Sequence, residues 1–492
     1  MAAEGPNRLV IPTSESAAVF GLLAFFLIIN LFTASLSPTV WRDEVLYTDP
    51  AYRLALAGEF NSAAWPHQPK EHFFAGNVPL YPILLAGWIK LFGFSVTAVR
   101  SLNYLLVALA AWLAYRAVTR GRLLQTTTMR LLFVLLFLFG YGMGLGYREG
   151  RPDALTMLIA AFGAYALTQV CALRWVSLAL AASLALWAGV QLGPFVALAL
   201  VAIVIVQRRA AVGTIVAVII GGLIGFGGLY ALYSSRGVWN EAQSSLLSSF
   251  TPGDSNDRHL SSCLSLYLQD FSLLPVLLVA LGGILFRSRI RATVPTTLTV
   301  QALVIPVVIQ MACGYPAYYS WMAFAPAALA ACIAADQLSK PAQLLPGLCF
   351  LAAGAVGLPA RVALIGLQIE ARDYRPIDQF VRDRIKTSDV VFCDFTAYYP
   401  ARRLAREVYV WPNHQEMTAD QCREVTVVFA RPGKDTPTGI REALGDLWQQ
   451  VGPAYETSAH LNGNKLHDWL AQYGAEKYHL AEYRRINRRG ER

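Results

Sequence analysis

Charged residues are scarce in this chain: they make up only 15% of its 492 residues, whereas 55% of the residues are hydrophobic. Because soluble domains carry about 25% charged residues, this composition excludes an ordinary soluble protein and indicates an integral membrane protein. The Lys and Arg residues behind the net charge of +9 lie mostly in short gaps between apolar segments. Basic residues in such gaps set membrane orientation, so we expect no nucleic acid partner.

Cysteine is also sparse, and the seven residues are too scattered for a disulfide framework or a zinc site. Cys393 and Cys422 lie in the same terminal region, where the alternatives are a single disulfide or two free thiols. The chain has no internal repeat and no Asn-x-Ser/Thr acceptor sequence. The second absence fits a bacterial inner membrane better than the endoplasmic reticulum.

Long apolar stretches occupy the first three quarters of the chain. Since roughly 20 apolar residues cross the hydrocarbon core, we predict about eleven transmembrane helices. The first stretch lacks the basic region and cleavage site of a signal peptide, so we expect it to be retained. The predicted spans are 17–36, 99–118, 130–147, 153–173, 175–190, 193–207, 211–233, 271–286, 294–313, 317–335 and 343–367.

Basic residues predict the orientation of these spans. The arginines of the loop at 116–130 and those of the later short loops share one face if the N-terminus is cytoplasmic. The loop 37–98 and everything after about 368 then lie on the extracytoplasmic side. The basic sequence RRINRRGER at the end of the chain leaves one alternative, a missed span that returns the tail to the cytoplasm.

The predicted external loop 37–98 is long and contains two helical patterns. The sequence LYTDPAYRLALAGEF has the apolar spacing of an interfacial helix. The segment 77–93 is apolar but short, with two prolines near its start and Lys90 near its end, so we predict a second helix lying in the membrane interface. Loops of this length are usually functional.

From about residue 370 the apolar runs shorten to strand length. DVVFCDF, EVYVW and EVTVVFAR predict strands, whereas TAYYPARRLAR and GIREALGDLWQQVG predict helices. We therefore divide the chain into a membrane domain, 1–369, and a small soluble α/β domain, 370–492, which the predicted topology places outside the cytoplasm.

Two acidic motifs stand at predicted span ends on the outer side. TVWRDEVLYTD places Asp43 and Glu44 after the first span, and GYREGRPDALTML carries Arg148, Arg151 and Asp153. For both motifs one alternative is simple helix capping. The other is contact with a lipid head group, since a lipid phosphate lies at this boundary. The aromatic sequence GYPAYYSWMAF likewise predicts either an interfacial belt or a surface on which a sugar stacks.

The order of these motifs resembles one family. The run WRDE with the following Y, A and LAGEF, then VPLYPILLAGWIKLFG, then YREGRPDALTMLIAAFGAYAL, and later GYPAYYSWMAFAPAALA, is similar to the GT-C superfamily of polytopic, lipid-linked-sugar glycosyltransferases. The chain most resembles bacterial relatives of the protein O-mannosyltransferases and of the lipid A aminoarabinose transferase. This resemblance covers about 1–370 and says little about the remainder.

The resemblance implies an enzyme that moves a sugar from a polyprenyl phosphate carrier to an acceptor hydroxyl on the outer side, with inversion. One displacement needs one general base and no acid, because the leaving phosphate is already a stable anion. The family motif assigns the base to Asp43, with Glu44 supporting it. Asp153 matches a second acidic position, which would orient hydroxyl groups or help hold a divalent ion.

The leaving phosphate needs cations where its negative charge develops. Arg148 and Arg151 are the preferred pair, because arginine binds phosphate through two parallel hydrogen bonds. Four further candidates, for which the alternative is an ordinary solvated loop position, are Lys70, His72, Arg258 and His259.

We expect activity without a metal, with a Mg or Mn ion shared by Asp43 and Asp153 as the alternative. The expected partners are a polyprenyl-phosphate-linked sugar, membrane lipids and an acceptor that is a glycolipid, a polysaccharide such as lipopolysaccharide, or a protein. Two other functions stay open. A lipid-linked-sugar transporter or flippase would carry charges inside its spans and broken helices in two halves, and a scaffold would use its charges only structurally. Nearly all charges here lie in loops, which favours the enzyme.

Overall fold

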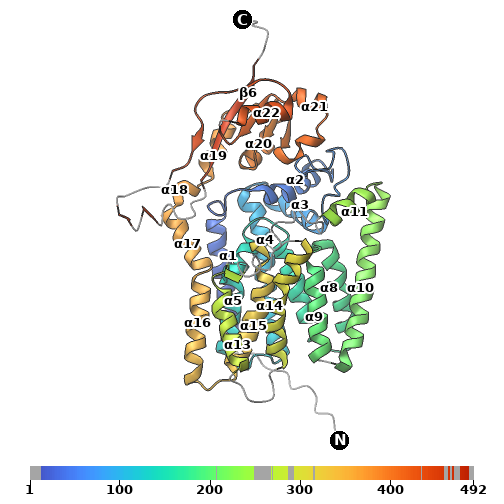
Figure 1. The fold of residues 1–492 in the computed structure, drawn as a ribbon, viewed down its shortest axis with the longest axis vertical. Coiled ribbons are helices and arrows are strands. Elements are labelled where there is room, and N and C mark those ends of the chain that lie inside the picture. The colour runs from blue at the N-terminus through green and yellow to red at the C-terminus, as the bar shows by residue number, and fades with distance from the viewer. Residues whose placement is uncertain are drawn as a thin grey trace.

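The computed structural model describes residues 13–206, 208–248, 267–268, 270–285, 293–313, 316–433, 435–458, 464–465, 468–469 and 477–486. A bundle of helices forms one part of the molecule, and a smaller domain built around a sheet lies at one end of it (Figure 1). Helices α2 (Arg42–Leu56) and α3 (Leu80–Phe92) lie between the two parts.

The helices of the bundle are mostly apolar. They are α1 (Thr13–Thr33), α4 (Val96–Arg120), α5 (Thr127–Phe139), α6 (Tyr141–Tyr147), α7 (Asp153–Ala166), α8 (Cys171–Ala188), α9 (Leu192–Val206), α10 (Arg208–Ser235), α13 (Leu273–Leu285), α14 (Thr293–Cys313), α15 (Trp321–Asp336), α16 (Leu344–Ala355) and α17 (Leu358–Leu367). A further short helix, α11 (Trp239–Ser248), follows α10.

Six described helical segments are long and apolar enough to cross a membrane, or seven if the bent pair α5 and α6 counts as one span. The remaining predicted spans coincide with the shorter apolar helices α7, α8, α9 and α13. The prediction of a polytopic α-helical membrane protein is therefore confirmed.

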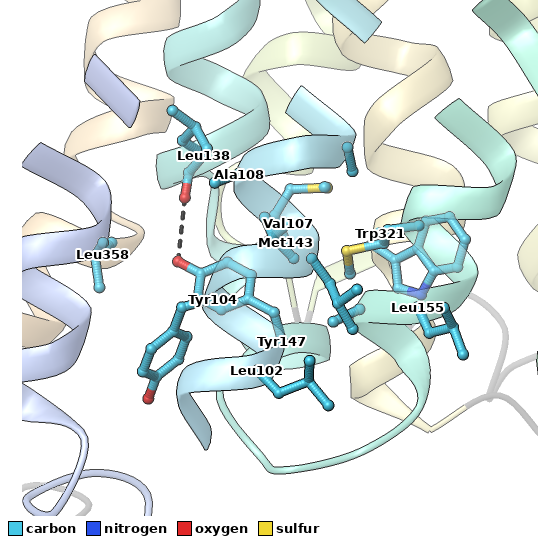
Figure 2. Close-up of a cluster of buried hydrophobic side chains, with 14 of the residues drawn as sticks. Leu102, Tyr104, Val107, Ala108, Leu138, Met143, Tyr147, Leu155, Trp321 and Leu358 are labelled. Atoms are coloured by element: carbon cyan, nitrogen blue, oxygen red, sulfur yellow. Dashed lines mark hydrogen bonds between the residues drawn. The ribbon is translucent and has the colours of Figure 1, made fainter. Parts of the chain in front are cut away.

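The predicted continuous span 130–147 is interrupted. α5 and α6 meet at Gly140 with a bend of 47°. The junction between α16 and α17 packs into this break, because a Cβ on Gly357 would lie 1.8 Å from the carbonyl oxygen of Phe139. The Tyr147 hydroxyl of α6 donates to the Leu138 carbonyl of α5 at 3.1 Å, so this hydrogen bond spans the break (Figure 2). A segment far away in the sequence thus packs directly against the bend.

The two helices predicted in the loop 37–98 are present as α2 and α3. Pro79 and Pro82 stand at the start of α3, as expected for residues that begin a helix rather than continue it. α2 differs from the expected interfacial helix, because every residue from Glu44 to Ala51 is buried. Helix α3 packs against α2, and Tyr398 and Tyr399 of the terminal domain donate hydrogen bonds to Asp49 and Glu44 from the other part of the molecule.

The terminal domain is an α/β domain, as predicted. Its sheet has the order β2-β1-β3-β6-β4, with β5 on β6; β1 pairs in parallel with β2 and β3, whereas β6 is antiparallel. The strands are β1 (Val390–Cys393), β2 (Glu407–Val410), β3 (Val427–Ala430), β4 (Trp448–Gln450), β5 (Tyr455–Glu456) and β6 (His479–Arg485). The helices are α18 (Ile369–Arg372), α19 (Arg375–Arg382), α20 (Tyr398–Leu404), α21 (Ala419–Glu424) and α22 (Thr436–Leu444).

Two expectations for this domain need correction. The helix predicted over GIREALGDLWQQVG ends early, because Gly445 turns the chain with φ +90° and Trp448–Gln450 then pairs with β6. Cys393 and Cys422 are both free thiols, so the disulfide alternative is wrong. Cys393 is instead a small buried residue of the central strand.

Glu407 of β2 joins the terminal domain to the loop 37–98. Its carboxylate pairs with Arg53 of α2 at 2.7 Å, with Lys70 at 2.8 Å and with Arg402 at 2.7 Å. Although burial alone would raise its pKa, these three cations lower the pKa of Glu407 to about 2. The pairing therefore holds the domain over α2.

A second buried carboxylate, Asp49 of α2, reinforces this contact. It accepts hydrogen bonds from the Ala63 amide at 2.7 Å and the Tyr398 hydroxyl at 2.9 Å. The Ala63 carbonyl in turn accepts from the Val410 amide at 3.1 Å, so the loop lies along the edge strand β2. The loop and the terminal domain thus form one continuous structure.

We predict that Glu407→Gln destabilises the terminal domain by about 3 kcal/mol, because three cations lose their shared partner. Limited proteolysis of the protein in detergent should show faster cleavage of this domain. Glu424→Gln is the control, since Glu424 pairs with Arg406 at an exposed site, 62% accessible. Equal cleavage of both variants would contradict the role of Glu407.

The lowered pKa of Glu407 predicts that the stability of the terminal domain depends on pH. Because its pKa is lowered from 4.5 to about 2 in the folded protein, its stabilising effect is complete above pH 4.5 and is lost as the pH falls toward 2. Proteolysis with pepsin, which works in this range, should show a cleavage rate that rises as the pH falls from 4 to 2 and rises less in Glu407→Gln.

Candidate functional site

Arg151 lies at the centre of a cluster that joins three distant parts of the chain. Its Nε donates to Asp153 at 3.0 Å, and its Nη1 donates to Asp43. The guanidinium stacks over the ring of Tyr318 at 3.4 Å, and the ring of Trp41 lies 5.5 Å away. The arginine is therefore held by two carboxylates and two aromatic faces.

Local backbone geometry explains how these groups meet. Asp43 is in the first turn of α2 and Asp153 is the first residue of α7, both favourable places for an acid at a helix N-terminus. Between them, Gly150 has φ +62°, and a Cβ there would lie 2.7 Å from Glu44 Cγ. The turn before α7 can therefore pack directly on α2. The short 3-10 helix η2 (Ala317–Tyr319) positions Tyr318, whose ring packs against the Arg151 guanidinium.

The two carboxylates differ in accessibility. The side chain of Asp43 is 26% exposed, whereas those of Arg151 and Asp153 are 4% and 0% exposed. Among the described residues, Asp153 Oδ1 has no hydrogen-bond partner. Asp43 is thus the acid that a ligand can reach, and Asp153 is the acid that orients Arg151.

A metal ion shared by Asp43 and Asp153 does not fit this arrangement. Arg151 bridges the two carboxylates and occupies the place between them. Nor does the described part of the chain contain a group of three or more His, Cys, Asp or Glu residues that could hold a metal.

Glu44 lies next to Asp43 in sequence but has different partners. Its carboxylate is fully buried, pairs with Arg100 of α4 at 2.6 Å and accepts from the Tyr399 hydroxyl at 2.8 Å. Arg100 also donates to the carbonyls of Ala34 at 2.6 Å and Pro38 at 2.8 Å. Glu44 therefore ties the start of α2 to the end of α1, to α4 and to the terminal domain.

The structure separates Arg148 from its predicted partner Arg151. Arg148 is fully buried and donates to Asn30 at 2.6 Å, to the Thr33 hydroxyl at 3.0 Å and to the Ser37 carbonyl at 2.9 Å. These acceptors all belong to α1 or the turn after it. Arg148 thus fixes α1 instead of facing the Asp43 cluster.

The remaining candidate cations are not in the cluster either. Lys70 belongs to the Glu407 network and also contacts the Tyr409 hydroxyl at 3.0 Å. His72 lies 2.8 Å from Glu241 of α11. Arg258 and His259 lie outside the described residues.

Tyr47, near the cluster, was not singled out from the sequence. Tyr47 follows Asp43 by one helical turn on α2, and its hydroxyl accepts from Asn77 at 2.9 Å. Burial raises the pKa of Tyr47, and the nearby charge of Arg151 opposes this effect. The i, i+4 spacing from Asp43 is the signal that could have found Tyr47, since it places both side chains on one helix face.

No protein-family model and no curated protein sequence matches the chain. Among solved structures, ArnT from Cupriavidus metallidurans bound to undecaprenyl phosphate superposes with a TM-score of 0.64 and 12% identity, over 96% of this chain and 99% of that chain. The chain has the GT-C fold. ArnT from the same organism in the apo state gives a TM-score of 0.59 and 14% identity, over 87% and 95% of the two chains.

The likeness in fold goes further than the sequence resemblance. Motifs point to the GT-C family only up to about residue 370, whereas the superposition covers 96% of the chain. The terminal α/β domain is therefore part of the shared fold with ArnT, and the expected fold class is confirmed.

We predict that Glu44→Gln lowers the free energy of unfolding by about 3–5 kcal/mol, because it leaves Arg100 buried without a counter-charge. Thermal unfolding of the purified protein in lipid nanodiscs would measure the loss. Asp43→Asn is the matched control at the neighbouring, partly exposed position, and it should shift the midpoint little. A larger shift for Asp43→Asn would contradict the separate roles of the two acids.

Proposed function

We propose that this protein is an integral membrane glycosyltransferase. It moves a sugar from a polyprenyl phosphate carrier to a hydroxyl group of an envelope acceptor, in one inverting displacement. The observation that carries the proposal is the fold match, over nearly the whole length of both chains, with ArnT bound to undecaprenyl phosphate. The acceptor is a glycolipid, a polysaccharide or a protein.

The proposed mechanism uses Asp43 as the general base. Asp43 removes the proton from the acceptor hydroxyl, and the oxygen attacks the anomeric carbon on the face opposite the phosphate. The bond between the anomeric carbon and the phosphate oxygen breaks, and the polyprenyl phosphate leaves with the electron pair. Only Asp43 among the acids of the cluster is accessible enough for this role.

Arg151 connects donor binding to the base. In the described structure it pairs with Asp43 and so occupies the carboxylate. When the donor binds, its phosphate replaces the Asp43 carboxylate as a partner of Arg151, and Asp43 becomes free to act as the base. Asp153 continues to hold the arginine Nε. Arg258 and His259 remain predicted phosphate-binding residues from the loop before α13.

We also propose a bacterial inner membrane with the N-terminus in the cytoplasm. Glu15 of α1 pairs with Arg130 of α5 at 2.7 Å, which brings the start of α1 to the arginine-rich loop at 116–130. The loop 37–98 and the terminal domain lie together at the opposite end of α1 (Figure 1). The positive-inside rule then supports an extracytoplasmic site.

We predict that Asp43→Asn lowers turnover by about 10²–10⁴-fold, the usual contribution of a general base. The assay supplies radiolabelled polyprenyl phosphate sugars and a crude envelope acceptor fraction to purified protein in lipid. Asp420→Asn is the control, because Asp420 is 81% exposed and pairs with the equally external Arg423, its one ionic partner among the described residues. If Asp43→Asn transfers label as fast as the native protein, the mechanism is wrong; if no donor is consumed at all, a flippase becomes the better account.

We further propose that the reaction needs no metal, because Arg151 already bridges the two acids that would share the ion. Label transfer should therefore be the same after dialysis against EDTA as before it. A loss of transfer that Mg²⁺ or Mn²⁺ restores would contradict this proposal.

A further inference from the structure

Arg361 is a charged residue in an apolar helix. It lies on α17, within the span candidate Pro341–Leu367. Among the described residues its side chain is half-buried and forms no hydrogen bond, ion pair or ring contact. A charge in such a span is costly, so one that is retained without a partner points to a function.

The packing of α17 directs Arg361 toward the candidate site. Gly357 abuts the break between α5 and α6, and Leu358 belongs to the buried cluster that also contains Tyr147 (Figure 2). Arg361 follows Leu358 by three residues, so both lie on the same helix face. Gly357 packs against the start of α6, and Arg361 lies close enough to Glu149, in the turn between α6 and α7, for its charge to act on that carboxylate.

Glu149 is the second polar residue of the proposed feature, beside Arg361. Its Oε2 is buried and has no hydrogen-bond partner among the described residues. Burial raises the pKa of Glu149 to about 7, and the charges of Arg151 and Arg361 act against that rise. Its carbonyl accepts from the indole of Trp41 at 3.2 Å, so Glu149 borders the Asp43 cluster.

Among the described residues the Arg361 guanidinium and the Glu149 carboxylate form no ion pair with each other, so each group is available to a ligand with complementary groups. A phosphate suits Arg361, and a hydroxyl suits Glu149. The other arginines around the cluster have partners: Arg100 has Glu44, Arg148 has α1 and Arg151 has its two acids. Arg42, at the start of α2, is exposed.

We propose that Arg361 and Glu149 bind the head group of a phosphate-bearing lipid that reaches the site from the membrane along α17. Arg361 contacts the phosphate, and Glu149 accepts from a hydroxyl of the attached sugar. The inference rests on the proposed function, since the lipid is a substrate: either the polyprenyl-phosphate-linked donor or a phosphorylated glycolipid acceptor.

The test measures lipid binding without chemistry. Purified protein in nanodiscs is titrated with undecaprenyl phosphate, with undecaprenol and with a monophosphorylated glycolipid, and binding is followed by native mass spectrometry. Arg361→Gln should weaken binding of one of the two phosphate lipids by about tenfold or more, the value of a charge-assisted hydrogen bond. Binding of undecaprenol should not change. The lipid that is affected identifies the source of the phosphate.

Three further variants keep the result interpretable. Arg375→Gln is the matched control, because Arg375 is 82% exposed and, in the described part of the chain, its only ionic partner is Asp373. Arg361→Lys keeps the charge and should retain part of the affinity, which a folding defect would not explain. Glu149→Gln removes a negative charge, so it should tighten bare undecaprenyl phosphate and weaken the same carrier bearing a sugar.

The outcomes separate this inference from the proposed function. Suppose that the native protein binds a phosphate lipid and transfers sugar, and that Arg361→Gln binds each phosphate lipid as tightly as the native protein does. This result overturns only the role of Arg361. The role of Glu149 is tested on the lipid that Arg361→Gln affects. If that lipid is the carrier, unchanged binding of both carrier forms by Glu149→Gln overturns this role; if it is the glycolipid, unchanged binding of the glycolipid does. Native protein that binds neither lipid and transfers no sugar overturns the proposed function as well.

Discussion

The buried ion pair between Glu44 and Arg100 fixes the position of everything else in the candidate site. Both side chains are fully removed from solvent, and such charges are tolerated only when they are paired and their remaining hydrogen-bonding groups are satisfied. Arg100 uses its other donors on carbonyls at the end of α1. The start of α2 is therefore held by α4, by the segment at the end of α1 and by the terminal domain. Asp43 directly precedes Glu44, so the Glu44–Arg100 pair also fixes the position of Asp43.

Around this anchor, acids of the same chemistry have different roles because their surroundings differ. Glu44 is structural, Asp153 orients Arg151, and Asp43 is left accessible. The terminal domain belongs to this arrangement, since Tyr399 donates to Glu44 and Glu407 binds cations of the loop. The domain is thus part of the structure that holds the site, and it covers part of the buried helix α2.

Much of this could be predicted from local sequence patterns. Apolar runs predicted the helices, and short β-rich runs predicted β1, β2 and β3. The motifs around Asp43 and Asp153 marked both acids and the arginine, Arg151, that bridges them. The partners of Glu44, Arg148 and Lys70 could not be predicted, because each lies far away in the sequence. The break at Gly140 was not predicted either. The residue that packs against it, Gly357, also lies far away in the sequence.

The most direct test of the account is an electron cryo-microscopy structure of the protein in nanodiscs with undecaprenyl phosphate. The account predicts phosphate density in contact with Arg151, beside an Asp43 carboxylate that has left this arginine. A phosphate bound elsewhere, with the Asp43–Arg151 pair intact, would contradict the proposal that this cluster is the transferase centre.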